Sequence, residues 1–273
     1  MIRYILMGLA LLASAGICAG AGGFESLNWL WLLPVGFAAS LVGLIFLFFL
    51  VLWISCLFVD MEKTQEKDNA YFRFMSITAA QIAIWVLRMR VHTKGLEKLP
   101  KHGRFLLVCN HINDLDPVTL LAYFGKRQLA FISKRENSTM FLVGKLMHKI
   151  MCQLINREND REALKTIITC IRLIQEDQVS IGVFPEGYVS LDRKLHPFRS
   201  GVFKVAQKAQ VPIVVCTLQN TYDALPNLLR FKATDMHLHL VGVLQPEDYA
   251  GMSTIDLGNR IYQMMDEDLN PGG

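Results

Sequence analysis

The chain has 273 residues, 52% of them hydrophobic, and a formal net charge of +4 at pH 7. The length allows a sizeable buried core, and so mild a charge gives no electrostatic reason to expect nucleic acid as a partner. Residues 1–59 carry only Arg3 and Glu25, whereas residues 60–273 carry the other 27 basic and 23 acidic side chains. This asymmetry predicts a membrane anchor over residues 1–60 and a globular domain after it.

Cysteine spacing and nucleophile motifs narrow the functional classes further. The six cysteines, at positions 18, 56, 109, 152, 170 and 216, show no CxxC pair and no accompanying His spacing. The pattern excludes a disulfide framework and a zinc site, and we expect a reducing environment and no metal or other cofactor. No GxSxG occurs, which argues against a serine hydrolase of that type.

Two apolar stretches open the chain, at about Tyr4–Ala21 and Leu27–Val59. Within the second, Phe37–Val59 is uncharged for 23 residues, about 34 Å of helix at 1.5 Å per residue and enough to cross a hydrocarbon layer of about 30 Å. The first is predicted to be either a cleavable signal peptide, with small residues at 19–21, or the first arm of a hairpin. Both alternatives remain open.

Basic residues set the expected orientation of these segments. Arg3 precedes the first stretch, residues 22–28 contain no Lys or Arg, and Lys63, Lys67 and Arg73 follow the second stretch. The positive-inside rule therefore predicts an integral protein of the cell (inner) membrane whose later domain is cytoplasmic. Residues 61–92 are predicted to be a linker whose third apolar region, Tyr71–Val91, is a helix that either lies in the membrane interface or docks on the domain.

From residue 93 to residue 273, short apolar runs alternate with helical patterns. The predicted fold class is α/β, a central, mostly buried mixed sheet flanked by helices and preceded by the N-terminal transmembrane helices. The predicted strands are Phe105–Cys109, Leu129–Ser133, Ile150–Ile155, Val179–Phe184, Pro212–Leu218 and Met236–Leu244. The predicted helices are about Pro117–Phe124, Thr139–Met147, Asp160–Gln175, Gly201–Ala209 and a last one from near Ser253 to about Leu269.

A histidine and an aspartate follow the first of these buried strands, in the run FLLVCNHINDLDP. On a continuous helix His111 and Asp116 would point apart, but Asn113 favours a turn and Asp116 suits the N-cap before Pro117. The turn would bring the carboxylate to one imidazole nitrogen and leave the other nitrogen free as a base. By spacing alone, a structural role for both residues stays open.

Three further segments have the same character of a strand followed by a polar or turn residue. Val183 is followed by FPEG at 184–187, and Leu154 and Ile155 are followed by Asn156 and Arg157. The run VPIVVCTLQN at 211–220, which begins with the VPIVV block at 211–215, is a buried strand that ends in a polar residue. With NHINDLD at 110–116, the four blocks resemble in order those of the glycerolipid acyltransferase family, most closely the 1-acylglycerol-3-phosphate acyltransferases. The resemblance covers about residues 92–220.

The resemblance implies a membrane-bound acyltransferase that moves a fatty acyl group from acyl-CoA or acyl-carrier protein to the sn-2 hydroxyl of 1-acylglycerol-3-phosphate, giving phosphatidic acid. It implies His111 as general base and Asp116 as the residue that orients it. The partners would be the lysophospholipid acceptor, the acyl donor and the bilayer. The implied substrate-binding residues are Asn110, Arg157, Phe184, Pro185, Glu186, Gly187, Arg193 and Arg199.

Two departures from the family pattern bear on the acceptor. The third block usually continues as FPEGTRS, whereas Tyr188 and Val189 stand here in place of Thr and Arg. The candidates to replace the missing cation are Arg193, Lys194 and Arg199. In the second block Met151 and Asn156 stand where Gly and Asp are expected. Another lysophospholipid or a lyso-aminolipid is the alternative acceptor, and a non-catalytic lipid-binding membrane protein is the alternative from a different class.

Overall fold

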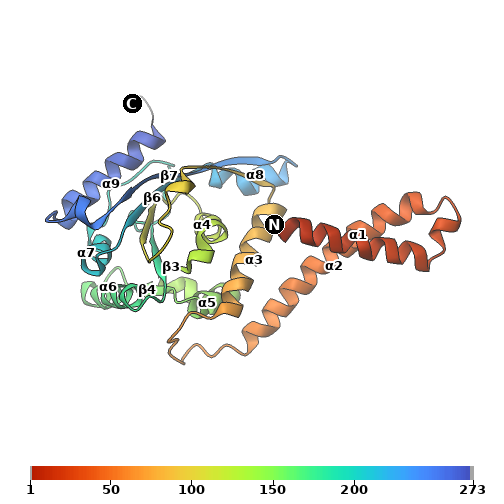
Figure 1. The fold of residues 1–273 in the computed structure, drawn as a ribbon, viewed down its shortest axis with the longest axis horizontal. Helices are drawn as coiled ribbons and strands as arrows, with labels where there is room; N and C mark the ends of the chain where they lie inside the picture. Colours follow the sequence, from red (N-terminus) through yellow and green to blue (C-terminus); the bar gives the residue numbers. More distant parts are fainter. Residues whose placement is uncertain (1, 271–273) are drawn as a thin grey trace. The chain divides into compact units, whose positions relative to one another are not determined.

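The computed structural model describes residues 2–270. The chain divides into two compact units, the first ending at Asp60 and the second beginning at Met61. The first unit consists of two long apolar helices, and the second is a seven-stranded sheet flanked by helices (Figure 1).

The first unit is a helical hairpin made of α1 (Ile2–Gly20) and α2 (Trp29–Leu57). The buried Ser14 hydroxyl of α1 donates to the Leu33 carbonyl of α2 at 2.6 Å, and a side chain at Gly36 would meet that hydroxyl at 3.0 Å. A small residue at position 36 therefore lets the helices approach. In this chain the first apolar stretch forms the first arm of a hairpin.

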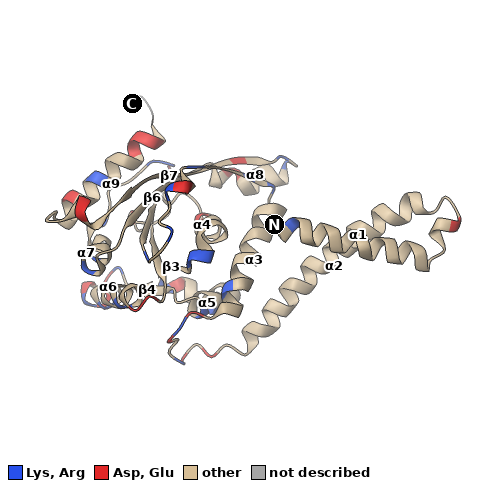
Figure 2. Cartoon of the chain, viewed as in Figure 1, with Lys and Arg blue, Asp and Glu red and all other residues tan. Residues whose placement is uncertain are grey.

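The hairpin has the surface of a membrane-embedded element. Figure 2 shows its helices free of charged residues, apart from a basic residue near the start of α1 and an acidic one in the turn. Large apolar side chains face outward, including Val42 and Phe46, which are 67% and 66% exposed. Both helices are long and apolar enough to cross a membrane, by length and composition.

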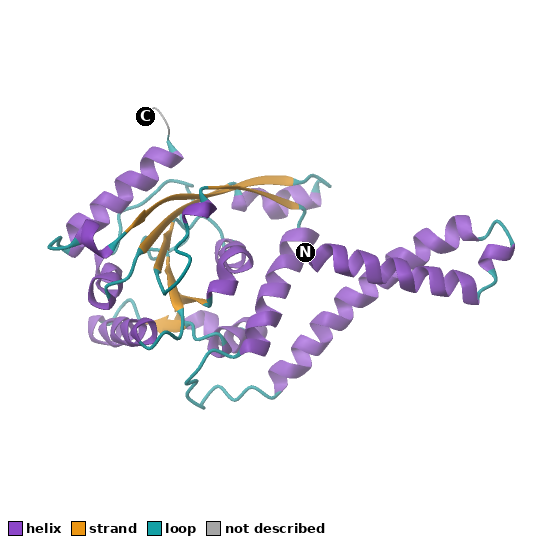
Figure 3. Ribbon diagram, in the orientation of Figure 1, coloured by secondary structure: helices purple, strands orange, loops and turns teal. Residues whose placement is uncertain are grey.

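The second unit is built on a mixed sheet (Figure 3) whose strand order is β1-β7-β6-β2-β5-β3-β4. Strands β6, β2, β5, β3 and β4 run parallel to one another, whereas β7 is antiparallel to β6 and parallel to β1. The sequence-based fold class is therefore confirmed. The strand bounds are β1 Met89–Lys94, β2 Leu106–Cys109, β3 Leu129–Lys134, β4 Gln153–Ile155, β5 Ser180–Val183, β6 Ile213–Gln219 and β7 Thr234–Leu244.

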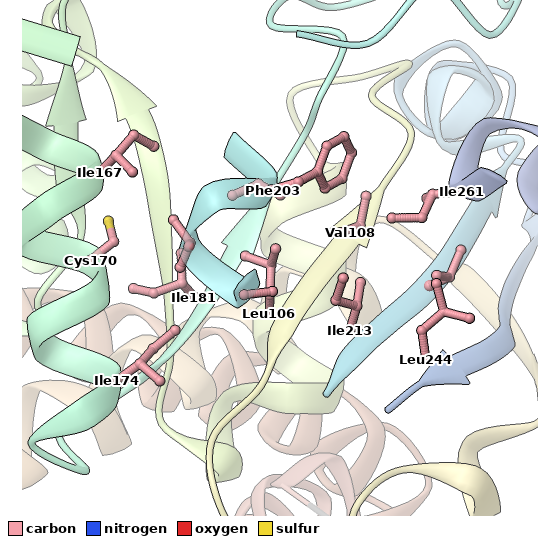
Figure 4. Close-up of a cluster of buried hydrophobic side chains, with 14 of the residues drawn as sticks. Leu106, Val108, Ile167, Cys170, Ile174, Ile181, Phe203, Ile213, Leu244 and Ile261 are labelled. Atoms are coloured by element: carbon pink, nitrogen blue, oxygen red, sulfur yellow. The ribbon is translucent and has the colours of Figure 1, made fainter. Parts of the chain in front are cut away.

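Helices cover both faces of this sheet, and each face has its own core. One face packs against α6, α7 and α9, where Ile181 and Ile213 of the strands contact Phe203 and Ile261 (Figure 4). The other face packs against α4, which supplies Leu120 and Phe124. Because the central strands are covered on both sides, their sequences are continuously apolar. The helix bounds are α3 Ala70–Val86, α4 Asp116–Phe124, α5 Phe141–Lys149, α6 Asp160–Gln175, α7 Lys204–Ala209, α8 Ala224–Leu229 and α9 Thr254–Leu269.

The composition of the third apolar region, Tyr71–Val91, predicted a single helix, but the structure divides the region into a helix and a strand. The helix α3 ends at Val86, Arg88 has a left-handed φ of 54°, and β1 begins at Met89 as an edge strand beside β7. One face of α3 is buried against α4 and α5 within the second unit, which corresponds to the docked form of the two predicted for it. Its other face exposes Phe74.

Among the other elements, the predicted and observed boundaries differ most at the start of β4. The predicted strand Ile150–Ile155 is shorter because α5 continues to Lys149 and the Cys152 N–H still donates to the Met147 carbonyl. By contrast α6 spans the predicted residues, with the Asn159 side chain accepting from the first backbone amides of the helix. The last helix begins after Ser253 as predicted, and the Ser253 side chain caps it through the Asp256 amide.

A buried ion pair ties α3 to the sheet. Arg73, treated from sequence only as a basic flank of a membrane segment, forms a salt bridge with Asp68 at 2.8 Å, and their side chains are 7% and 5% exposed. The same guanidinium donates to the carbonyls of Leu129, at the start of β3, and Ile150, after α5. The pair therefore joins three elements that are distant in sequence.

Removing one partner of this pair is expected to destabilise the second unit strongly. Arg73→Leu leaves the Asp68 carboxylate buried without its partner and should lower the free energy of unfolding by about 3 kcal/mol or more. The matched control is Arg135→Leu, which breaks an exposed pair with Glu162 and should cost less than about 1 kcal/mol. Thermal and chemical denaturation of detergent-purified protein measure both, and equal losses would contradict a structural role for the buried pair.

Candidate active site

Three of the four sequence blocks converge at one edge of the sheet. Strands β2, β5, β4 and β6 are all in the parallel part, so their carboxyl ends open at the same edge. The residues that follow the ends of β2, β5 and β4 belong to the NHINDLD, FPEG and LINR blocks, whereas VPIVV, at 211–215, leads into β6 from its opposite end. Ligand sites of open parallel sheets lie at this edge. Topology therefore brings together three segments that are spread over residues 110–187.

The loop after β2 folds around the Asp116 carboxylate, which is fully buried. Its Oδ2 atom is 2.9 Å from His111 Nδ1 and accepts hydrogen bonds from the backbone amides of Ile112 and Asn113, at 2.7 and 2.8 Å. Sequence placed Asp116 at the N-cap of the following helix, but that position falls on Leu115 and Asp116 is the first helical residue. The carboxylate turns back toward the loop and holds its amides instead.

The His111 imidazole is fixed on two sides. Nδ1 faces the Asp116 carboxylate, and the ring stacks on Phe184 with centroids 4.2 Å apart. The side chain remains 15% exposed. An imidazole whose Nδ1–H is held by a carboxylate keeps Nε2 unprotonated and able to accept a proton. The predicted contact between His111 and Asp116 is therefore present, and so is the turn that makes it.

Asn110 and Glu186 serve the scaffold of this loop. The Asn110 side chain donates to the Leu218 carbonyl and accepts from the Leu218 amide, at 2.9 and 2.8 Å, so it fastens β2 to β6. The Glu186 side chain is 1% exposed, and its oxygens accept from the His111 amide, the Ser190 hydroxyl and the His196 amide. Both were expected to contact substrate. Their polar atoms instead bind other parts of the chain, which makes them positioning residues.

The backbone of the FPEG turn is also committed. The Gly187 amide donates to the Phe184 carbonyl, and the Pro185 carbonyl accepts from the Arg199 amide. Gly187 has a φ of +83°, which favours glycine, and a side chain there would meet the Arg199 side chain at 3.0 Å. The Gly187 amide is therefore engaged within the turn, and the turn seats Arg199.

Two arginines form the basic part of the site. Partial burial, followed by the nearby positive charge of Arg199, lowers the pKa of the Arg157 guanidinium, while the charge of Glu136 opposes this shift. Within residues 2–270, neither guanidinium has an ion pair or a hydrogen bond to another side chain. Of the three cations proposed from sequence, Arg199 is the one whose charge acts on Arg157. Arg193 lies elsewhere, over the Tyr222 ring.

The neighbouring thiol is unsuited to covalent chemistry. Burial raises the pKa of Cys109 well above its usual value, and the charges of Cys216, Asp116 and Glu186 raise it further. A thiol with a raised pKa stays protonated and is a poor nucleophile. Within residues 2–270, no three His, Cys, Asp or Glu side chains are placed to hold a metal ion.

Sequence reasoning missed Ser190. This buried residue donates its hydroxyl to Glu186 and its amide to the His111 carbonyl, so it joins the FPEG turn to the β2 loop. A signal for it was present, because Ser190 occupies the place of the last residue of the FPEGTRS pattern. Lys134 was also not singled out from the sequence. It ends β3 and pairs in register with Ile155 of β4, and Arg157 follows Ile155 by two residues.

Comparison with known proteins assigns this arrangement to a family. The sequence model of the acyltransferase family matches residues 90–219, which contain all four blocks. The chain therefore carries an acyltransferase-family domain. The probable 1-acyl-sn-glycerol-3-phosphate acyltransferase of Mycoplasma pneumoniae is 32% identical over 164 residues, 58% of this chain and 60% of that protein. The corresponding enzyme of Borreliella burgdorferi is 25% identical over 173 residues, 62% of this chain and 68% of that protein.

A solved structure shares the fold of the whole chain. The crystal structure of the 1-acyl-sn-glycerophosphate acyltransferase PlsC from Thermotoga maritima superposes with a TM-score of 0.62 at 19% sequence identity, covering 99% of this chain and 96% of that one. The likeness extends over the two apolar helices as well as the acyltransferase domain. At this identity it establishes the fold.

The buried carboxylate of Glu186 is expected to be required for acyl transfer. In Glu186→Gln an amide NH₂ replaces one of two oxygens that each face an N–H or O–H donor. Because two donors cannot face each other, the β2 loop must shift. A shift near 1 Å lowers kcat by roughly 10²-fold. The matched control is Asp192→Asn, an exposed carboxylate of the same loop, which should keep activity near wild type. Steady-state acyl transfer measures both, and a fully active Glu186→Gln would contradict the positioning role.

Proposed function

We propose that this protein is a membrane-bound 1-acylglycerol-3-phosphate O-acyltransferase that transfers a fatty acyl group from a thioester donor, acyl-CoA or acyl-carrier protein, to the sn-2 hydroxyl. The observation that carries the proposal is the His111–Asp116 contact at 2.9 Å, open at the sheet edge near two unpaired arginines. The family of the domain and the printed names of the relatives support it. The product is phosphatidic acid, a phospholipid precursor.

His111 acts as a general base in the proposed reaction. Nε2 removes the proton from the acceptor hydroxyl as its oxygen attacks the thioester carbonyl carbon. Asp116 stabilises the imidazolium that forms, because its carboxylate already holds Nδ1–H. The tetrahedral intermediate then collapses, the carbon–sulfur bond breaks, and the proton passes from Nε2 to the departing thiolate. An ester and a free thiol are the products, with no acyl-enzyme and no cofactor.

Arg157 and Arg199 are the proposed phosphate site of the acceptor. Two like charges near each other destabilise the ligand-free protein, and the lowered pKa of Arg157 reports that cost together with its partial burial. A bound phosphate removes the repulsion and accepts charge-assisted hydrogen bonds from both guanidiniums. Arg199 thus takes over the charge that Val189 does not supply in the third block.

The apolar hairpin supports a membrane location. Its uncharged, exposed surface over α1 and α2 suits the hydrocarbon layer in which the acceptor and product reside. We propose the inner membrane, with the acyltransferase domain on the cytoplasmic side, where the thioester donors are made. Lys63 and Lys67 after the hairpin support this orientation.

Loss of His111 should abolish acyl transfer. In an assay that offers palmitoyl and oleoyl donors, as CoA and carrier-protein thioesters, to a panel of lysolipids, His111→Ala should be roughly 10²- to 10⁴-fold slower than wild type. Transfer to lysophosphatidate that depends on His111 supports the proposed acceptor. A preference for another lysolipid would overturn the acceptor, and no His111-dependent transfer to any acceptor would favour a non-catalytic lipid-binding protein.

Neutralising Arg199 should weaken acceptor binding selectively. Arg199→Gln removes one charge-assisted contact and should raise KM for lysophosphatidate by about ten- to a hundredfold, with little change in KM for the donor. Arg260→Gln, which removes a half-buried cation of α9 that donates to the Asp248 carbonyl, is the matched control and should keep the wild-type KM. An unchanged KM in Arg199→Gln would contradict the proposed phosphate site.

A further inference from the structure

A cavity opens on the β6 side of the His111 loop, whereas Arg157 and Arg199 follow β4 and β5, which lie on the other side of β2 in the strand order. It has a volume of about 420 Å³, within the range of small-molecule sites. Asn110 and Ile112, the two neighbours of His111 in the chain, line it, and neither Arg157 nor Arg199 does. The ends of β6 and α9 and residues 193–195 form the rest of its wall.

Two cations stand in this wall. The Arg193 guanidinium lies over the Tyr222 ring, 3.5 Å from its centroid, and Lys194 is its neighbour. Within residues 2–270, neither side chain has an ion pair or a hydrogen bond to another group. Stacking on a ring fixes the plane of a guanidinium and leaves its N–H edge available for a phosphate. The acidic side chain in the wall, Asp266, accepts a hydrogen bond from Asn270, and the lining keeps a net positive charge.

The segment that carries these cations is anchored at both ends. Before them, the Ser190 hydroxyl donates a hydrogen bond to the Glu186 carboxylate, and the Ser190 amide donates one to the His111 carbonyl. After them, the Leu195 carbonyl accepts from the Tyr262 hydroxyl of α9 and the His196 amide donates to Glu186. Arg193 itself has a left-handed φ of 64°. The segment therefore holds the cations in register with the catalytic loop.

We propose that this cavity binds the phosphopantetheine arm of the acyl donor, with its phosphate at Arg193 and Lys194 and its thioester end toward His111. The inference rests on the proposed function, because direct transfer requires both substrates at His111 together. The arm is common to CoA and to carrier protein, so its phosphate and amides are the chemistry recognised. Gln219 and Asn220 present amide side chains to the same cavity.

The proposal assigns separate cations to the two substrates. Arg157 and Arg199 hold the acceptor phosphate, and Arg193 and Lys194 hold the donor phosphate on the opposite side of the imidazole. The sequence offered Arg193, Lys194 and Arg199 as interchangeable replacements for one missing charge. Their different surroundings, Tyr222 for Arg193 and Gly187 for Arg199, divide them between two sites.

Binding without turnover tests this assignment. Full-length His111→Ala protein in detergent is titrated calorimetrically with CoA, with holo-carrier protein and with apo-carrier protein, which lacks the arm. We expect CoA or holo-carrier protein to bind, apo-carrier protein to bind more weakly than holo, and Arg193→Gln/Lys194→Gln in the same background to lose about tenfold or more in affinity. Arg199→Gln is the matched control and should leave donor affinity unchanged.

A second variant reaches the cavity without touching its cations. Leu269→Trp, at the end of α9, narrows the cavity and should also weaken donor binding while lysophosphatidate binding is kept. Donor affinity unchanged in both variants, equal binding of apo- and holo-carrier protein, or an effect on lysophosphatidate alone would each overturn the proposal. These outcomes are distinct from failure of the proposed function, which would appear as absent His111-dependent transfer in the wild type.

Discussion

The geometry of the site depends on one buried carboxylate. Glu186 follows β5, yet its oxygens hold the amide of His111 after β2 and two groups of the segment that continues to His196. Strands β2 and β5 are neighbours in the sheet, so their loops emerge side by side and need a common anchor. Hydrogen bonds from several donors to one carboxylate are strong in a buried site, because few water molecules compete for its oxygens. The imidazole and the segment that carries Arg193 and Lys194 are positioned through this anchor.

The basic side chains of the site form two separate groups. The turn at Gly187 seats Arg199, whose charge acts on Arg157, and the segment after Ser190 carries Arg193 to the Tyr222 ring. Reaction between two anionic substrates faces repulsion between their phosphates. In the proposed reaction, separate basic sites with the base between them would hold the reacting ends together while keeping the phosphates apart.

Some features were predictable because they depend on local sequence. The uncharged run of α2, the capped helix α6 and the continuously apolar strands β2, β5 and β6 follow from periodicity, length and capping residues. The edge strand β1 was hidden because its hydrogen bonds come from β7, more than a hundred residues later. Arg73 was misread for a similar reason, since the carbonyls and the Asp68 carboxylate that bury it are assembled only by the fold.

For the site, the amino-acid sequence by itself determined the family resemblance, the pairing of His111 with Asp116 across a short turn, and the presence of apolar segments able to span a membrane. These are local properties of spacing and composition. Only the tertiary structure decided which polar residues face inward, as Asn110 and Glu186 do, and which of three nearby cations stands beside Arg157. Those outcomes depend on the order of strands in the sheet, because that order sets which loops are neighbours, and no local pattern encodes it.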